Sequence, residues 1–248
     1  RVKEFASLIC QAGVDLGVPV VDVYTEWDAL RAMDLSAWRL LMSETIHPSM
    51  AGHKNIAEQV AETIAGRPVS LADVLAEQPV CGGFIARLKD GKPVTLAAPA
   101  SLTAYARAMV LRRFHDADLT VVSLSEKVAS LDALVGEYKA IRTRKPDFVL
   151  VSLPSEVLKV GNEEAFIRQT SWVVNWALPF GGSAWTAVGV DPALVCSGLT
   201  PQQSEGAELM REIVRGHDLD WISQPPGASI KLQDALDQWF DGQVVKGQ

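Results

Sequence analysis

Short runs of apolar and β-branched residues alternate along the chain with longer stretches in which apolar residues recur every three or four positions. The first pattern predicts buried strands and the second predicts helices with one buried face. Strands are expected at Val18–Val23, Val94–Ala98, Leu119–Leu124, Phe148–Leu153, Ala184–Val190 and Leu219–Ile222. This alternation predicts an α/β fold: a doubly wound parallel sheet between helical layers, in a three-layer α/β/α arrangement.

One of the predicted helices, over residues 53–65, has apolar residues at the spacing of a single buried face. Ile56, Val60 and Ile64 are expected to be buried in an α/β layer together with the strand Val18–Val23. Gly66 and Pro68 are expected to end this helix, because glycine favours helix C-caps and proline cannot continue a helix.

The order of elements indicates two related parts. The helix-then-strand order of Phe5–Ala12 and Val18–Val23 occurs again in Glu205–Val214 and Leu219–Ile222, which predicts about one and a third copies of one fold. The Gly82-Gly83 pair and the Asp90-Gly91 turn signal lie in the junction between them. The expected organisation is a first domain over residues 1–67, a linker over 68–92 and a second domain over 93–248.

Composition limits the kinds of partner and cofactor. The apolar fraction of 48% is enough for a buried core, and a net charge of −7 argues against nucleic acid or an anionic membrane surface as a partner. No apolar run reaches the ~18 residues of a membrane span. Cys10, Cys81 and Cys196 are odd in number and widely spaced, so they are expected to be buried free thiols rather than disulfide or zinc ligands. No Gly-x-Gly-x-x-Gly or Walker sequence is present, and no cofactor or metal is expected.

The candidate chemistry is concentrated in the polar stretch from Ser43 to His53. A carboxylate three residues before a histidine can share a loop with it and fix the tautomer of its imidazole, which leaves the other ring nitrogen to act as a general base. Glu44 and His47 have this spacing, and a hydrogen bond between their side chains is predicted. Gly52 is expected to allow a close approach of loop and helix. The alternative is a helix N-terminal loop with solvated histidines.

These residues resemble the last signature block of the SGNH (GDSL-type) hydrolases, in which Asp-x-x-His-Pro is followed by a Gly-His pair. His47, Pro48, Gly52 and His53 match in identity and spacing, whereas Glu44 stands where the family has aspartate. The resemblance implies that residues 1–67 are the last third of such a domain and that its nucleophile lies ahead of Arg1. The chain begins at Arg1 in the middle of a helical pattern. The resemblance also implies serine acyl transfer to water without metal or cofactor, on acetyl or short acyl esters, including those on carbohydrate.

A second resemblance to the same family lies at the end of the strand predicted at Val94–Ala98. Ser101, Leu102 and Thr103 match the Ser-(Leu/Ile)-Thr of the family's nucleophile block, but Pro99 and Ala100 stand where glycine and aspartate or glycine are usual. Ser101 is therefore either a nucleophile at a strand-to-helix turn or the N-cap of a helix over 102–113.

The other family positions in the second copy lack the expected groups. Residues 123–127 contain no oxyanion glycine, and Glu156 stands where an oxyanion asparagine is expected; Asn162 could replace it only if its loop refolded. No histidine follows Ile222, and His115 and His217 are expected at the surface. The resemblance thus implies a degenerate, inactive second copy, with Ser101 and His47 in separate sites.

Two alternatives remain open for the second part of the chain. Trp172, Trp176 and Trp185 either line a carbohydrate-binding face or form a buried cluster. The rival to an ester hydrolase is accordingly a non-catalytic interaction or carbohydrate-binding module on a degenerate hydrolase fold, and an unrelated doubly wound domain is also possible for residues 93–248.

Overall fold

A computed structural model describes residues 1–76, 78–179, 185–225 and 229–247. The chain divides into two compact units, Arg1–Leu75 and Ala76–Gln248, and each is described by itself. None of the described helices is long and apolar enough to cross a membrane.

The second unit is built on a five-stranded parallel sheet in the order β2-β1-β3-β4-β5. This is a common strand order of doubly wound α/β folds, and the predicted α/β class with a parallel sheet is confirmed. Both ends of each of the five strands lie within two residues of the positions predicted for the second domain. Their bounds are Val94–Pro99 (β1), Leu119–Leu124 (β2), Phe148–Val151 (β3), Thr186–Val190 (β4) and Trp221–Ile222 (β5).

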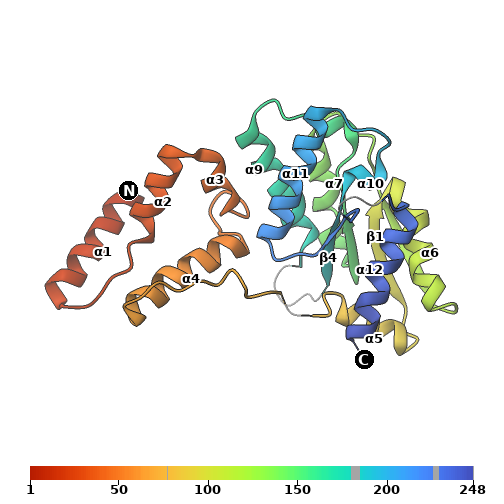
Figure 1. Cartoon of the computed structure of the whole chain (residues 1–248), viewed down its shortest axis with the longest axis horizontal. Coiled ribbons are helices and arrows are strands. Elements are labelled where there is room, and N and C mark those ends of the chain that lie inside the picture. Colours follow the sequence, from red (N-terminus) through yellow and green to blue (C-terminus); the bar gives the residue numbers. More distant parts are fainter. Residues whose placement is uncertain (77, 180–184, 226–228, 248) are drawn as a thin grey trace. The chain divides into compact units, whose positions relative to one another are not determined.

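Helices cover both faces of this sheet, as the three-layer arrangement requires (Figure 1). One face is covered by α5 (Gly82–Lys89), α6 (Thr103–Arg113) and α12 (Leu232–Lys246). The opposite layer is formed by α7 (Leu131–Lys139), α9 (Glu163–Ala177) and α11 (Pro201–Gly216). The short elements are η1 (Ala100–Leu102), α8 (Ile141–Arg144), η2 (Ser155–Val157) and α10 (Pro192–Val195).

The core of the second unit forms because its central strands are apolar on both faces. All four residues of β3 are fully buried. Phe148 of this strand stacks on Phe84 of α5 and on Trp239 of α12, with ring centroids 5.3 and 5.7 Å apart. Such buried aromatic pairs contribute contact energy beyond the area that they remove from water.

Helix α5 lies within the stretch that the sequence predicted to be a linker, residues 68–92. Its side chains Phe84, Ile85 and Leu88 are buried in the same core cluster as β1 and α12. Residues 82–92 are therefore part of the second unit, and the division between the units falls after Leu75. The Gly82-Gly83 pair begins this helix instead of separating two domains.

The three cysteines are free thiols, as predicted, but only one is buried. Cys81 lies in the core, where burial raises its pKa to about 12. Cys10 and Cys196 are half-buried, so the expectation of burial was wrong for these two.

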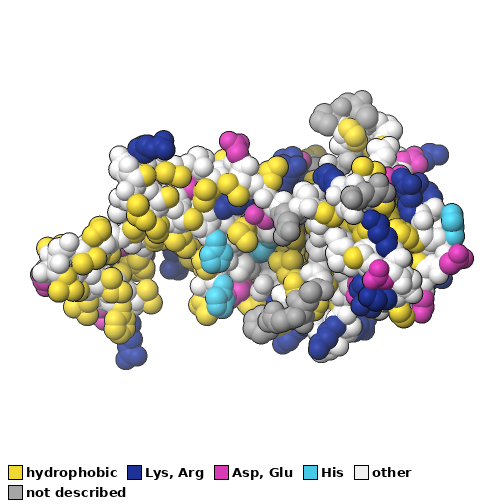
Figure 2. Space-filling model, turned by 90° about the horizontal axis from the view of Figure 1, so that it is seen from below, with side chains coloured by type: hydrophobic (Ala, Val, Ile, Leu, Met, Phe, Trp, Pro, Cys, Tyr) yellow, Lys and Arg dark blue, Asp and Glu magenta, His cyan; other side chains and the backbone are white. Residues whose placement is uncertain are grey.

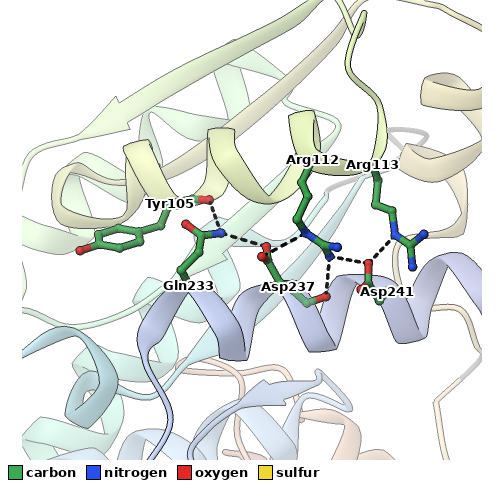
Figure 3. A network of polar contacts seen from close by, with 6 residues as sticks. All are labelled: Tyr105, Arg112, Arg113, Gln233, Asp237 and Asp241. Carbon is green, nitrogen blue, oxygen red and sulfur yellow. Dashed lines mark hydrogen bonds and ion pairs between the residues drawn. The ribbon is translucent and has the colours of Figure 1, made fainter.

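An ion-pair network joins α6 to α12 at the surface of the second unit (Figure 3). Arg112 pairs with Asp237 at 3.0 Å and with Asp241 at 2.6 Å, and Arg113 pairs with Asp241 at 2.6 Å. Burial acts to raise the pKa of Asp241, but the hydrogen bonds from Arg113 and Arg112 outweigh it, so the pKa lies below its ordinary value.

Replacing Asp241 with asparagine is expected to lower the free energy of unfolding by about 1 kcal/mol at neutral pH, since networked surface pairs contribute at this level. A carboxyl group with a lowered pKa in the folded state stabilises above its unfolded pKa of about 3.9, and this stabilisation is lost as the pH falls through the folded value. Urea unfolding of wild type and Asp241→Asn at pH 7 and pH 3 tests this, with the exposed Asp116→Asn as control. An equal difference at both pH values would contradict it.

The first unit consists of four helices and no strand. They are α1 (Val2–Leu16), α2 (Val23–Met33), α3 (Leu35–Leu40) and α4 (Met50–Ala65). Aspartate side chains cap two of them: Asp22 accepts from the Thr25 amide and Asp34 accepts from the Ala37 amide. The Trp27 indole donates to Asn55 at 2.7 Å and ties α2 to α4.

Two predictions for this unit were wrong. Val18–Val23 forms no strand: residues 18–22 lie outside any regular element and Val23 begins α2. A parallel strand needs a neighbour to accept its backbone hydrogen bonds, and the unit, which is described in full, offers no other strand. The helix over 53–65 is present within α4 and ends at Gly66 (φ 64°), but Val60 and Ile64 are 39% and 82% exposed. The proposed repeat of helix and strand is therefore absent here.

Candidate functional site

The loop between α3 and α4 is closed by backbone hydrogen bonds and holds the Glu44–His47 pair. Met42 and Pro48 form an antiparallel bridge, and the Ser43 amide donates to the His47 carbonyl at 3.0 Å. Residues 43–47 therefore form a tight turn, and the amides of Thr45, Ile46 and His47 point toward its interior.

The Glu44 carboxylate accepts these amides. It receives hydrogen bonds from the amides of Thr45, Ile46 and His47 at 2.5, 3.2 and 2.9 Å. It also contacts Nδ1 of the His47 ring, so the predicted contact between the two side chains is present. The extra methylene of glutamate relative to aspartate allows the carboxylate to fold back over its own loop.

The two side chains differ sharply in exposure. Glu44 is 9% exposed, whereas His47 is 71% exposed. Burial acts to raise the pKa of Glu44, but hydrogen bonds from the His47 ring and from the three amides outweigh it and hold the pKa below its ordinary value. A buried, charged carboxylate thus holds one nitrogen of an imidazole whose ring faces solvent.

Contacts at the start of helix α4 fix the position of this loop. The Ser49 hydroxyl accepts from the Gly52 amide and donates to the Leu40 carbonyl at 3.0 Å. A Cβ on Gly52 would overlap the Leu41 carbonyl oxygen and lie 2.9 Å from Cβ of Pro48. The close approach predicted for Gly52 is confirmed, and only glycine permits it.

In the second unit, Ser101 lies in η1 at the carboxyl end of β1 and is exposed. Its hydroxyl donates to Glu126 at 2.8 Å, and its amide donates to the same carboxylate at 2.5 Å. The N-cap of α6 is Leu102, without a side-chain hydrogen bond, so Ser101 does not cap this helix. Its partner is an acid and not a histidine.

Glu126 was not anticipated as the partner of Ser101. The carboxyl ends of neighbouring parallel strands meet at one edge of the sheet, and Pro99 of β1 is in register with Leu124 of β2. The loop after β2 therefore reaches Ser101. The sequence does not specify that β1 and β2 are neighbours, and without this information Glu126 could not be identified as the partner of Ser101.

The residues at the presumed oxyanion positions have other contacts. Glu156 accepts from the Ser155 hydroxyl at 3.2 Å, and Asn162 is the N-cap of α9, where it accepts from the Ala165 amide at 2.8 Å. Asn162 is thus occupied by a structural role. Of the two remaining histidines, His115 is exposed as predicted. His217 is half-buried, contrary to prediction, and burial lowers its pKa.

The three tryptophans of this unit fall into two environments. Trp185 is buried and donates to the Ala177 carbonyl at 2.8 Å, which fits a core role. Trp172 and Trp176 are half-buried on the outer surface of α9, and their rings stack with centroids 5.8 Å apart.

Within the described residues no group of three or more potential metal-ligating side chains comes together. No protein-family model, curated protein or solved structure matches the chain. The candidate site therefore stands on its geometry: the Glu44–His47 pair in the first unit and Ser101 with Glu126 in the second.

Proposed function

We propose that the first unit supplies the acid–base pair of a serine ester hydrolase of the SGNH type, acting on acetyl or short acyl esters, including those on carbohydrate. The observation that carries this proposal is the contact of the buried Glu44 carboxylate with Nδ1 of an otherwise exposed His47 ring. This is the arrangement by which a carboxylate orients a histidine base in hydrolytic triads.

The proposed chemistry assigns a task to each nitrogen of His47. Nδ1–H donates to Glu44, so Nε2 carries the lone pair that accepts the proton of a serine hydroxyl as its oxygen attacks the ester carbonyl. The imidazolium then gives this proton to the leaving alcohol when the C–O bond breaks. The same nitrogen then takes a proton from water as the water oxygen attacks the acyl-enzyme carbonyl, and it returns this proton to the serine oxygen when the acyl C–O bond breaks and the acid is released.

The serine for this chemistry is proposed to lie outside residues 1–248. The Ser43 hydroxyl donates to the His47 carbonyl and the Ser49 hydroxyl to the Leu40 carbonyl, and no hydroxyl is hydrogen-bonded to the His47 ring among the described residues. Ser101 belongs to the other unit and is held by Glu126.

The surface of the first unit supports the idea that it is part of a larger domain. Met42 is its one buried large apolar side chain, whereas Phe5, Leu8 and Ile64 are 65%, 65% and 82% exposed. Figure 2 shows apolar side chains gathered over the helices of this unit. An exposed apolar surface of this extent marks a face that is normally covered, and the β-branched segment at 18–22 would find its missing strand partners in a sheet.

The chain 1–248 by itself is expected to hydrolyse p-nitrophenyl acetate at a rate near the uncatalysed background, because the first unit supplies the base and no serine of that unit is hydrogen-bonded to the His47 ring. Ser101→Ala should leave that rate unchanged. The measurement is the release of p-nitrophenolate by wild type, Ser101→Ala and His47→Ala at equal concentration. A clear rate abolished by both substitutions would contradict the proposal and establish a composite site of the two units.

A second candidate function, a non-catalytic carbohydrate-binding module, is favoured for the second unit by two observations. Its motif serine lies against a carboxylate, whereas its paired tryptophans lie half-exposed on α9.

A further inference from the structure

We propose that the groove between α7 and α9 binds a polysaccharide whose sugar rings carry carboxylates. This groove, called the tryptophan groove below, has a volume of about 290 Å³. Its lining residues are Asp132, Val135, Lys139, Arg168, Gln169, Trp172 and Trp176. The proposal rests on the carbohydrate-binding function proposed for the second unit and does not depend on ester hydrolysis by the first unit.

The groove arises from helical spacing on both sides. On α9, Trp172 and Trp176 are four residues apart and therefore lie on one face, one above the other. On α7, Asp132, Val135 and Lys139 follow the same spacing and face them. The apolar and polar groups of the groove are thus placed by two helices that are packed on each other in the core of the unit.

The tryptophan pair is held in place before any ligand arrives. The Arg142 guanidinium packs over the Trp176 ring at 4.2 Å and donates to the Asn175 carbonyl at 2.9 Å. Trp172 stacks on Trp176 with an interplanar angle of 21°. Rigid aromatic surfaces bind at a low cost in conformational entropy, and the axial C–H groups of a sugar ring can pack on an indole face.

The polar groups around the rings suit sugar hydroxyls and carboxylates. Gln169 donates to Asp132 at 2.9 Å, so an amide and a carboxylate lie beside the rings and can exchange hydrogen bonds with vicinal hydroxyls. Lys139 and Arg168 in the groove and Arg142 over the Trp176 ring carry three positive charges, against the two negative charges of Asp132 and of Glu164, which pairs with Arg168 at 3.5 Å. The Lys139 ammonium lies 5.4 Å from the centroid of the Trp176 ring. In a chain with a net charge of −7, this local excess of positive charge favours an anionic ligand.

Nucleic acid is the other polymer that combines negative charge with stacking groups. Asp132 within the groove and the negative charge of the whole chain both oppose the binding of a phosphate backbone. A sugar acid instead offers a carboxylate to the cations of the groove and hydroxyl groups to Asp132 and Gln169. The observations therefore favour the acidic polysaccharide.

The test is a calorimetric titration of the chain 1–248 with polygalacturonate, compared with neutral galactan and with oligodeoxythymidylate. Binding of polygalacturonate is expected, with about tenfold weaker affinity in Trp172→Ala, which removes one stacking surface. Lys139→Gln changes an exposed side chain and is expected to weaken binding about threefold at low salt.

The matched control is Trp38→Ala. Trp38 in α3 is also half-buried and lies beneath Arg31 and Arg39 at 5.0 and 4.6 Å, but it lies in the first unit. Binding should be unchanged in this variant. Equal affinity for galactan, preference for the oligonucleotide, absence of binding, or binding that survives both groove substitutions would each overturn the proposal.

Discussion

Replacing His47 with alanine is expected to lower kcat/KM for p-nitrophenyl acetate about 10³-fold, the loss typical of removing a general base. The enzyme for this experiment is the form of the protein that includes any residues its gene encodes before Arg1. The loss is expected because Nε2 of His47 is the proton acceptor in the proposed mechanism and Glu44 holds the opposite nitrogen. Progress curves at saturating and limiting ester give kcat and KM separately.

The control for this prediction is His53→Ala. His53 is exposed in the first turn of α4 and has no side-chain partner among the described residues, so activity should be retained. An extended protein that keeps its esterase rate after His47→Ala would exclude His47 as the base.

In the proposed mechanism Glu44 orients the His47 ring. Variants of Glu44 can separate this role from its contribution to the structure of the loop. Glu44→Gln keeps one acceptor oxygen in place of two and loses the charge that stabilises the imidazolium, whereas Glu44→Asp keeps the charge and both acceptor oxygens. We expect Asp to recover most of the activity that Gln loses.

Replacing Gly52 with alanine is expected to destabilise the first unit by about 2 kcal/mol and, under the proposed function, to abolish most of the esterase rate of the extended protein. The added Cβ would overlap the Leu41 carbonyl oxygen, which is backbone and cannot rotate away, so α4 must separate from the loop that holds Glu44 and His47. Hydrogen exchange followed by mass spectrometry should show faster exchange in peptides covering residues 41–65 and no change in those covering 94–124.

A glycine in open space provides the comparison. A Cβ on Gly136 of α7 would meet nothing within 4 Å, so Gly136→Ala is expected to stabilise its helix by up to about 1 kcal/mol. Unchanged exchange at residues 41–65 in Gly52→Ala would contradict this prediction, because it would show that the loop tolerates the added side chain.

The candidate site was predicted from sequence to different extents in the two units. The Glu44–His47 contact and the close approach of Gly52 to Leu41 join residues three and eleven positions apart, so local spacing determined them. The partner of Ser101 is Glu126, 25 residues away, and it follows from the pairing of β1 with β2. Neither residue type nor spacing along the chain encodes which strands are neighbours.

By itself, the sequence determined the strands of the second unit, because β1, β3 and β4 are apolar runs buried on both faces and β2 begins and ends with buried leucines. It also predicted the contact between Glu44 and His47 in the loop before α4. Only the tertiary structure decided that Val18–Val23 is not a strand and that Val60 and Ile64 are exposed, although their patterns are those of buried elements. The physical reason is that the periodicity of apolar residues shows only which face of a helix or strand prefers burial. Burial itself requires another element that packs on that face. The 75 residues of the first unit provide no such element for these faces.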